Sequence, residues 1–239
     1  MKKLIFSLFL TTFCVALFAQ EEGESGSSTR LKKTDRVVID ISYDLWQDAP
    51  SGLAFKAIQP SYAISSFQDY PLGNSNFSFA WGLSINMHNM HTDGLITLDT
   101  AGNTEFMKIP STVTFGGTTK DISHKINKMT LTYIETPIEF RFRTKSVFPF
   151  KVYAGFKLGV LLQEHTKYVG DDFITGSDNT IKFKEYKHQN FETLRYGPTL
   201  RIGYRWISLH ASYNMTSVFK KDKGPQMYPI SIGLSIMPY

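Results

Sequence analysis

A strict alternation of apolar and polar side chains between Asn190 and Trp206 is the feature that most constrains this chain. The segment NFETLRYGPTLRIGYRW carries Leu, Tyr, Ile or Trp at every second position from Leu194 on, except for Pro198, with Arg, Thr and Gly between them. Successive side chains of an extended strand leave opposite faces of the sheet. The segment is therefore predicted to be a β-strand with one apolar face and one cationic, glycine-containing face.

The same period of two recurs along the chain after residue 36. Strands are predicted at 37–46, 57–70, 76–90, 128–143, 149–164, 190–206, 207–219 and 227–238. Alternating segments of this length are the signature of transmembrane β-barrel strands, and eight strands make the smallest common bacterial barrel. The predicted fold class is all-β: a single eight-stranded antiparallel up-and-down transmembrane β-barrel with a filled polar lumen.

The connections between the predicted strands alternate in length. The short ones are PLGNSN after Tyr70, TKSVFP after Arg143 and a tight turn at Arg205–Trp206, and the long ones are 47–56, 89–127, 165–189 and 220–226. Barrels of the outer membrane have short periplasmic turns and longer extracellular loops. The pattern therefore predicts that both ends of the barrel domain lie in the periplasm, with 89–127 and 165–189 outside the cell.

The first 36 residues differ from the rest. Residues 1–19 combine two lysines, an apolar core and a terminal Ala19, which is typical of a cleaved signal peptide. Residues 20–36 are polar and rich in Gly and Ser, which predicts a flexible periplasmic tether before a barrel domain at 37–239. The single cysteine, Cys14, falls within the signal, so the exported chain offers no disulfide, thiol nucleophile or cysteine metal ligand.

The charge balance gives no support for a nucleic-acid partner. The net charge of +5 falls by two to +3 when Lys2 and Lys3 leave with the signal. This excess is too small to favour a nucleic-acid partner.

A soluble eight-stranded barrel of the lipocalin type is the rival fold, because alternation alone does not say which face points outward. An eight-stranded barrel has an interior just wide enough to be filled by side chains. The large side chains on the apolar faces of the predicted strands would overfill this interior. Glycines such as Gly155, Gly159 and Gly197 on the polar faces suit a crowded interior. The membrane barrel is therefore favoured, with location in the cell outer membrane and contact with its lipid.

Several segments resemble the PorT-like outer-membrane β-barrel family. They are YDLWQDAPSG (43–52), PLGNSNFSFAWGLSI (71–85), YIETPIEFRFRT (133–144), LRYGPTLRIGY (194–204) and PISIGLSIMPY (229–239). The most specific piece is the stretch with Tyr133, Glu135, Pro137 and Ile138. The resemblance implies the barrel fold and its location, and it implies little about activity, since only part of the family is associated with a secretion system.

The inward face is predicted to carry many charges. They are Asp40, Asp44, Glu135 and Glu139 against Arg141, Arg143, Lys151, Lys157, Arg195, Arg201 and Arg205. An ion-pair lattice that fills the lumen is favoured over an anion-selective path, because eight strands leave no aqueous channel. If Phe142 faces Phe150 across the TKSVFP turn, Glu135 lies opposite Lys157 and pairs with it.

Two groups of side chains raise the question of chemistry. MHNMHTD offers His88, His91 and Asp93 as ligands for a zinc or copper ion, although no pair has a known ligand spacing on a regular element. Near the outer rim, histidines at 88, 91, 124, 165 and 188 accompany Ser123, Thr166 and Asp171, the residue types of a lipid-modifying site. Loop histidines are more often simply solvated, and no nucleophile motif is present in the sequence.

We therefore assign no catalytic, metal-binding or cofactor-binding residue from the sequence, and we expect a non-enzymatic structural or interaction component of the cell envelope, accessory to secretion or envelope assembly. Its partners would be envelope or secretion proteins that bind loops 89–127 and 165–189, since loops on a rigid scaffold carry function disproportionately. The alternatives are a rim-active lipid-modifying enzyme and a small-solute channel.

Overall fold

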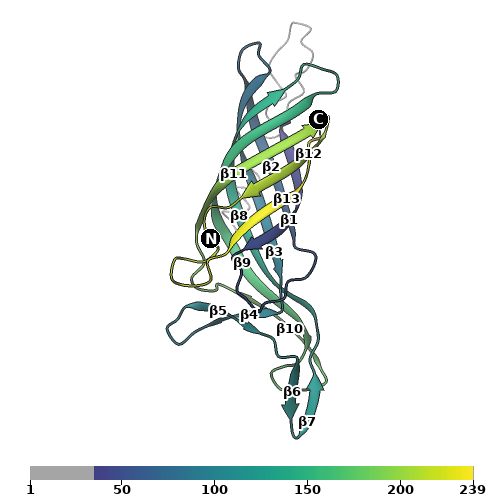
Figure 1. The fold of residues 1–239 in the computed structure, drawn as a ribbon, viewed down its shortest axis with the longest axis vertical. Coiled ribbons are helices and arrows are strands. Elements are labelled where there is room, and N and C mark those ends of the chain that lie inside the picture. Colours follow the sequence, from purple (N-terminus) through teal and green to yellow (C-terminus); the bar gives the residue numbers. More distant parts are fainter. Residues whose placement is uncertain (1–34, 239) are drawn as a thin grey trace, which may run out of the picture. The chain divides into compact units, whose positions relative to one another are not determined.

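Eight long strands form a closed antiparallel barrel in the computed structural model, which describes residues 35–238 (Figure 1). They are β1 (Val37–Gln47), β2 (Pro60–Pro71), β3 (Phe77–His91), β8 (His124–Arg143), β9 (Phe150–Asp171), β11 (Leu194–Tyr204), β12 (Ile207–Tyr213) and β13 (Tyr228–Ile236). Each pairs with its neighbour in the chain, and β13 returns to pair with β1. The predicted fold class is confirmed. The predicted signal peptide and most of the predicted tether fall outside the described residues.

The long loops, which the sequence places outside the cell, contain strands that the alternation did not reveal. β4 (Gly94–Leu98) pairs with β5 (Thr104–Lys108), and β6 (Thr112–Phe115) pairs with β7 (Thr118–Asp121). β10 (Thr180–Tyr186) pairs with the far half of β9. β8 and β9 are longer than predicted, so together with β10 they continue the sheet beyond the point where β11 ends its pairing with β9.

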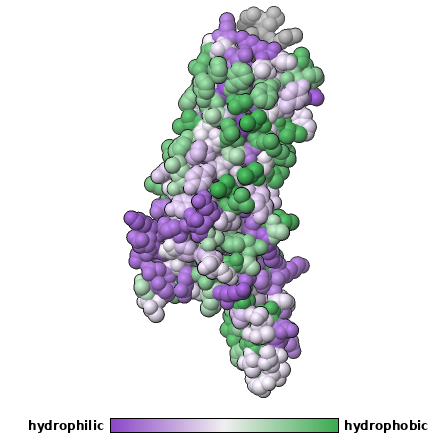
Figure 2. All heavy atoms as spheres, in the orientation of Figure 1, coloured by the Kyte–Doolittle hydropathy of each residue, from purple (hydrophilic) through white to green (hydrophobic). Residues whose placement is uncertain are grey.

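The outward face of the barrel is apolar. Figure 2 shows hydrophobic residues concentrated over the barrel strands and hydrophilic ones over the loops. Exposed large apolar side chains of the strands include Ile41, Leu45, Ile64, Phe79, Trp81, Ile85, Phe140, Leu158, Leu162, Leu200, Ile202, Leu209 and Leu234. An outward apolar band of this kind is what a lipid-embedded barrel presents. Within residues 35–238, no helix is long and apolar enough to cross a membrane.

The short connections gather at one end of the barrel, as predicted. Arg205 adopts a φ of 57° in the tight turn before β12 and lies over the Phe148 ring at 4.3 Å. Phe77 stacks on Phe140 with ring centroids 5.2 Å apart. Exposed aromatic side chains gather at this end, as aromatic residues do at membrane–water interfaces; besides Phe77, they include Tyr70, Phe148, Phe150, Tyr204 and Trp206.

The second strand keeps the face that its sequence predicts. Tyr62, Ile64 and Tyr70 are exposed, and the polar Ser66 pairs with Val37 of β1 without a change of register. One strand ends earlier than predicted. β12 stops at Tyr213 rather than near 219, because the chain then leaves the barrel sheet and Phe219 forms an isolated bridge with Phe191.

Candidate functional site

The inward faces of the eight strands enclose a lumen filled with charged and polar side chains. The buried ionisable groups there include Asp40, Asp44, His88, Glu135, Glu139, Arg141, Lys151, Lys157, Arg195, Arg201 and His210. A charge out of water is costly unless it is paired and hydrogen-bonded. The pattern of partners therefore decides whether these groups are structural or are free to receive a ligand.

Arg201 links two acids near the middle of the barrel. Its Nη2 lies 2.7 Å from Oδ2 of Asp40, and Nη1 makes a short contact with Glu139. Ser235 donates a hydrogen bond to the same Asp40 carboxylate and accepts one from Arg201 Nε at 3.1 Å. Both acids are thereby satisfied by the same guanidinium, which presents the planar fork suited to this role.

A second chain of contacts crosses the lumen toward the extracellular side. Asp44 accepts from Nδ1 of His88 at 2.6 Å, and Nε2 of His88 accepts from Arg195 Nη1 at 2.7 Å. Arg195 Nε donates to Glu135 at 2.6 Å and its guanidinium lies 3.7 Å from the Tyr133 ring centroid. A histidine whose two nitrogens serve Asp44 and Arg195 in this way is neutral and fully engaged.

The third cluster lies toward the short turns. Arg141 is fully buried between the rings of Phe67 and Tyr153, at 4.3 and 4.7 Å, and pairs with Glu139 at 2.7 Å. Lys151 Nζ lies 2.7 Å from Asp35, whose other carboxylate oxygen receives the Tyr153 hydroxyl. Asp35, which the sequence assigned to the tether, therefore helps to fill the lumen.

The strands approach one another closely because of glycine on the inward face. A Cβ at Gly197 would lie 1.8 Å from the backbone oxygen of Tyr213, and a Cβ at Gly155 would lie 2.4 Å from the backbone oxygen of Ile138. The expectation of a crowded interior is confirmed at these positions.

An apolar cluster, for which the sequence carries no periodic signal, lies at the long-loop end of the barrel. Met90 and Leu131 rise from the strands, and Phe191, Phe219 and Met227 fold over them from the loops. The rings of Phe191 and Phe219 lie 4.7 Å apart, and Phe106 of the β5 hairpin packs edge-on against Phe219 at 6.0 Å. We call this cluster the mouth cap; it packs at the end of the barrel that carries the long loops.

Two expectations about lumen charges need correction. Phe142 faces Val152 rather than Phe150, so Glu135 lies opposite Gly159 and not Lys157. The Glu135–Lys157 ion pair nevertheless forms diagonally, with Nζ and Oε1 3.7 Å apart. Arg205 does not enter the lumen at all, because it occupies the tight turn and is exposed.

The structure separates the three candidate metal ligands, His88, His91 and Asp93. His88 is buried in the lumen, where it contacts the Asp44 carboxylate. Asp93 instead accepts the backbone N–H of Ala54 at 2.7 Å and pairs with Lys108 at 3.4 Å. The backbone N–H of His91 donates to Gln59 at 2.7 Å. No group of three or more His, Cys, Asp or Glu side chains in the described part of the chain is arranged to hold a metal ion.

The rim residues form two separate contacts rather than one site. Ser123 donates to Asp171 at 2.9 Å on one side. On the other, Thr166 Oγ1 lies 3.3 Å from His188 Nε2, and Glu185 lies 3.7 Å from that same nitrogen. A hydroxyl–histidine–acid triad uses the two ring nitrogens for different partners, one toward the nucleophile and one toward the acid. These contacts do not have that form.

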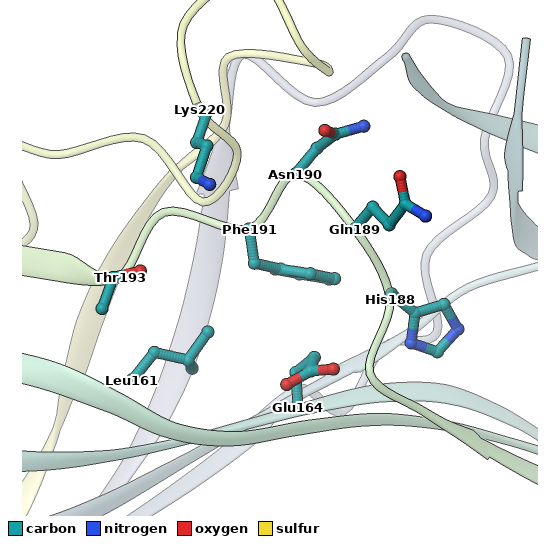
Figure 3. A pocket seen from close by; sticks show the side chains of 8 residues that line it. All are labelled: Leu161, Glu164, His188, Gln189, Asn190, Phe191, Thr193 and Lys220. Atoms are coloured by element: carbon teal, nitrogen blue, oxygen red, sulfur yellow. The ribbon is translucent and has the colours of Figure 1, made fainter. Parts of the chain in front are cut away.

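An open pocket of about 510 Å³ adjoins the mouth cap (Figure 3). Its lining consists of Leu161, Glu164, His188, Gln189, Asn190, Phe191, Thr193 and Lys220. Oε1 of Glu164 and Nδ1 of His188 are buried there without a hydrogen-bond partner.

A β-bulge directs Glu164 into this pocket. Tyr133 pairs with Leu161 while the adjacent Thr132 pairs with Gln163, so Leu162 is the extra residue. The bulge changes which positions face inward: Leu161 before it and Glu164 after it both point to the mouth. Bulges commonly re-aim side chains near functional sites. The sequence carries no periodic signal for such an insertion, which is why the pocket was missed.

Comparison with known proteins supports the assignment of the fold. The family model described as "Outer membrane protein beta-barrel domain" matches residues 40–220. No curated protein matches the sequence significantly. Two engineered variants of a Rhodopseudomonas blastica porin match among solved structures, each 8% identical over 84% of this chain and 98% of the porin. Their TM-score of 0.21 is too low to support an argument. The family model covers most of the barrel, and this chain therefore belongs to the outer membrane protein β-barrel domain family and is an integral protein of the outer membrane.

Proposed function

We propose that this protein is a non-enzymatic structural or interaction component of the cell envelope, which binds a protein partner through its extracellular loops. The closed lumen is the observation that carries the proposal. Arg201 binds Asp40 and Glu139 and Arg195 binds Glu135 across the interior, and the mouth cap packs at the long-loop end of the barrel. Function in such a barrel falls to the surfaces it displays rather than to its interior.

The loops have the order that a recognition surface needs. The 89–127 loop contains the β4–β5 and β6–β7 hairpins, and the 165–189 segment contributes β10. Large apolar side chains are exposed on them, among them Met107, Phe115, Ile174 and Tyr186. Exposed apolar side chains at an ordered rim are suited to protein contact. The resemblance to PorT-like barrels favours a partner in secretion or envelope assembly.

Photocrosslinking in living cells tests this proposal. A photoreactive amino acid replaces Met107, Phe115 or Ile174 on the loops, and Val147 in a short turn at the opposite end serves as the matched exposed control. We expect the loop positions to capture one and the same envelope protein, identified by mass spectrometry, and the control not to capture it. Loop positions that yield no protein above the control would contradict the proposal.

The lipid-modifying alternative has one observation in its favour, the contact of Thr166 with His188 beside the pocket. In that case Thr166→Ala and His188→Ala would each leave the barrel folded and abolish a change in lipid composition that overexpression of the native protein causes. Identical lipid profiles for the native protein, both variants and cells without the barrel would dismiss this alternative.

A further inference from the structure

Three lysines form a row across adjacent strands at the extracellular end of the barrel. Lys167 of β9 lies directly opposite Lys128 of β8 on one side and Lys184 of β10 on the other. Side chains directly opposite on an antiparallel pair share a face, with Cβ atoms about 4.5–5.5 Å apart, and like charges in that position are destabilising. The fold thus holds three ammonium groups together on one face against their mutual repulsion.

No acidic side chain of the described residues forms an ion pair with these three lysines. Among residues 35–238, the ion pairs of lysine involve Lys108, Lys120, Lys151 and Lys157, and none involves the row. Glu185, next to Lys184 in sequence, alternates to the other face and contacts His188. The row is therefore a local concentration of positive charge with no internal counterion.

Local contacts hold two of the three ammonium groups in place. Lys128 Nζ donates to Oδ1 of Asn89 at 2.8 Å, and Lys184 Nζ lies 4.8 Å from the centroid of the Tyr186 ring. His91 of β3 lies opposite Lys128 and extends the row onto a fourth strand. Neutral partners of this kind fix the position of a charge without cancelling it.

The row faces away from the lumen. Beyond the bulge, Glu164 and Thr166 of β9 lie opposite Leu131 and Met129, which belong to the mouth cap. The alternate position Lys167 must then leave by the outer face. This is the same face that carries the exposed Leu162 and Met87 in the apolar band.

The height of the row brings the lipid headgroups within reach of the lysine side chains. His91 follows Met87 by four residues, and Lys167 follows Leu162 by five. At about 3.3 Å per residue and a tilt of about 40°, these backbone positions lie roughly 10–13 Å beyond the last lipid-exposed side chains. The headgroup region begins at that edge, and lysine stems bend along apolar surface to place their ammonium groups in a nearby polar layer.

We propose that Lys128, Lys167 and Lys184 bind the phosphate groups of an anionic lipid in the outer leaflet, whose acyl chains lie along Leu162 and the adjoining apolar band. Phosphate supplies the counter-charge that the protein lacks, and continuity with the lipid-facing surface selects a lipid over a soluble anion or a protein. The proposal rests on the outer-membrane location and is independent of what the loops bind.

Binding of defined lipids to the purified full-length barrel in detergent tests the proposal. The probes are diphosphorylated lipid A and the same lipid with its phosphates removed. The test variant is K128Q/K167Q/K184Q, and the control K145Q/K221Q/K223Q removes the same charge elsewhere. We expect at least a tenfold loss of affinity for the phosphorylated lipid in the test variant alone, and equal, weak binding of the dephosphorylated lipid by all three proteins.

Thermal unfolding separates a binding defect from a folding defect. Without lipid, the test variant should unfold at the same or a higher temperature than the native protein, because like-charge repulsion is relieved. Phosphorylated lipid should then stabilise the native protein and the control but not the test variant. Equal lipid affinity in the test and native proteins would overturn the proposal. So would an equal loss in the control, or full competition by millimolar inorganic phosphate.

Discussion

Glu135 binds Arg195 across a glycine. The two side chains come from strands separated by β9, and Gly159 lies between them, so that its missing Cβ leaves room for Arg195 Nε to reach Oε1 of Glu135 at 2.6 Å. Lys157 is a more distant partner of the same carboxylate, at 3.7 Å.

This arrangement predicts unequal effects of substitution. Glu135→Gln leaves Arg195 and Lys157 buried without their shared acid and should cost about 3–5 kcal/mol of unfolding free energy. Arg195→Gln should cost a similar amount, and Lys157→Gln clearly less. The double variant of Glu135 and Arg195 should recover part of the sum, measured by urea unfolding in detergent. Strict additivity of the two single costs would contradict the pairing.

Alanine substitutions of the inward-facing glycines should destabilise the barrel to different extents, depending on which atoms the new methyl group meets. Gly197→Ala places a methyl group 1.8 Å from the backbone oxygen of Tyr213, which cannot move without separating the strands. Gly159→Ala meets the Glu135 side chain at 2.9 Å, which can shift. We expect the first variant to fail to reach the folded form on heat-modifiability gels, and the second to fold with a loss of about 1–3 kcal/mol. Equal behaviour of the two would be inconsistent with this packing.

How far the sequence predicts this structure depends on whether a feature is periodic. The faces of the strands followed from the period of two. The predicted faces are correct even for the strands joined by the TKSVFP turn, whose predicted pairing register was wrong by two residues. A shift by two residues keeps each side chain on its face, whereas a shift by one would reverse it. The mouth cap joins Phe191, Phe219 and Met90 from distant segments, and the bulge at Leu162 breaks the period. Neither the mouth cap nor the bulge leaves a local pattern in the sequence from which it could be predicted.

The stability of the turn that begins at Asp172 should depend on pH. Its carboxylate accepts the Thr175 hydroxyl and the backbone N–H groups of Ile174 and Thr175, both at 2.9 Å, and these bonds, those of Thr175 foremost, lower its pKa to about 2. Because the folded pKa is depressed, the stabilisation of this turn is complete above the ordinary value near 3.8 and is lost as the pH falls toward 2.

Amide hydrogen exchange measures this effect. The amides of Ile174 and Thr175, corrected for their intrinsic rates, should lose protection between about pH 4 and 2. In Asp172→Asn, which has no charge to titrate, protection should be lower and constant over that range. A native turn that stays equally protected at pH 2 would show that the carboxylate does not hold it.

The lipid-facing alternation is testable because the chain after residue 14 contains no cysteine. Single cysteines at 156, 158, 200 and 202 should react with a lipid-soluble photolabel, since those side chains are exposed on the outer face, whereas cysteines at 157 and 201 should not, since those side chains are buried in the lumen. Labelling at 157 and 201 by a water-soluble reagent, with protection of the other four, would reverse the two faces.

Planar-bilayer recording of the purified barrel tests the closed lumen most directly. With Arg201 and Arg195 bound to acids across the interior and the mouth cap above them, we predict no stable unitary conductance across a range of voltages and salts. Gel mobility of the same preparation, which shifts on heating for a folded barrel, confirms that the inserted protein is native. Reproducible, ion-selective conductance steps from that preparation would contradict the account of the barrel as a closed, filled structure.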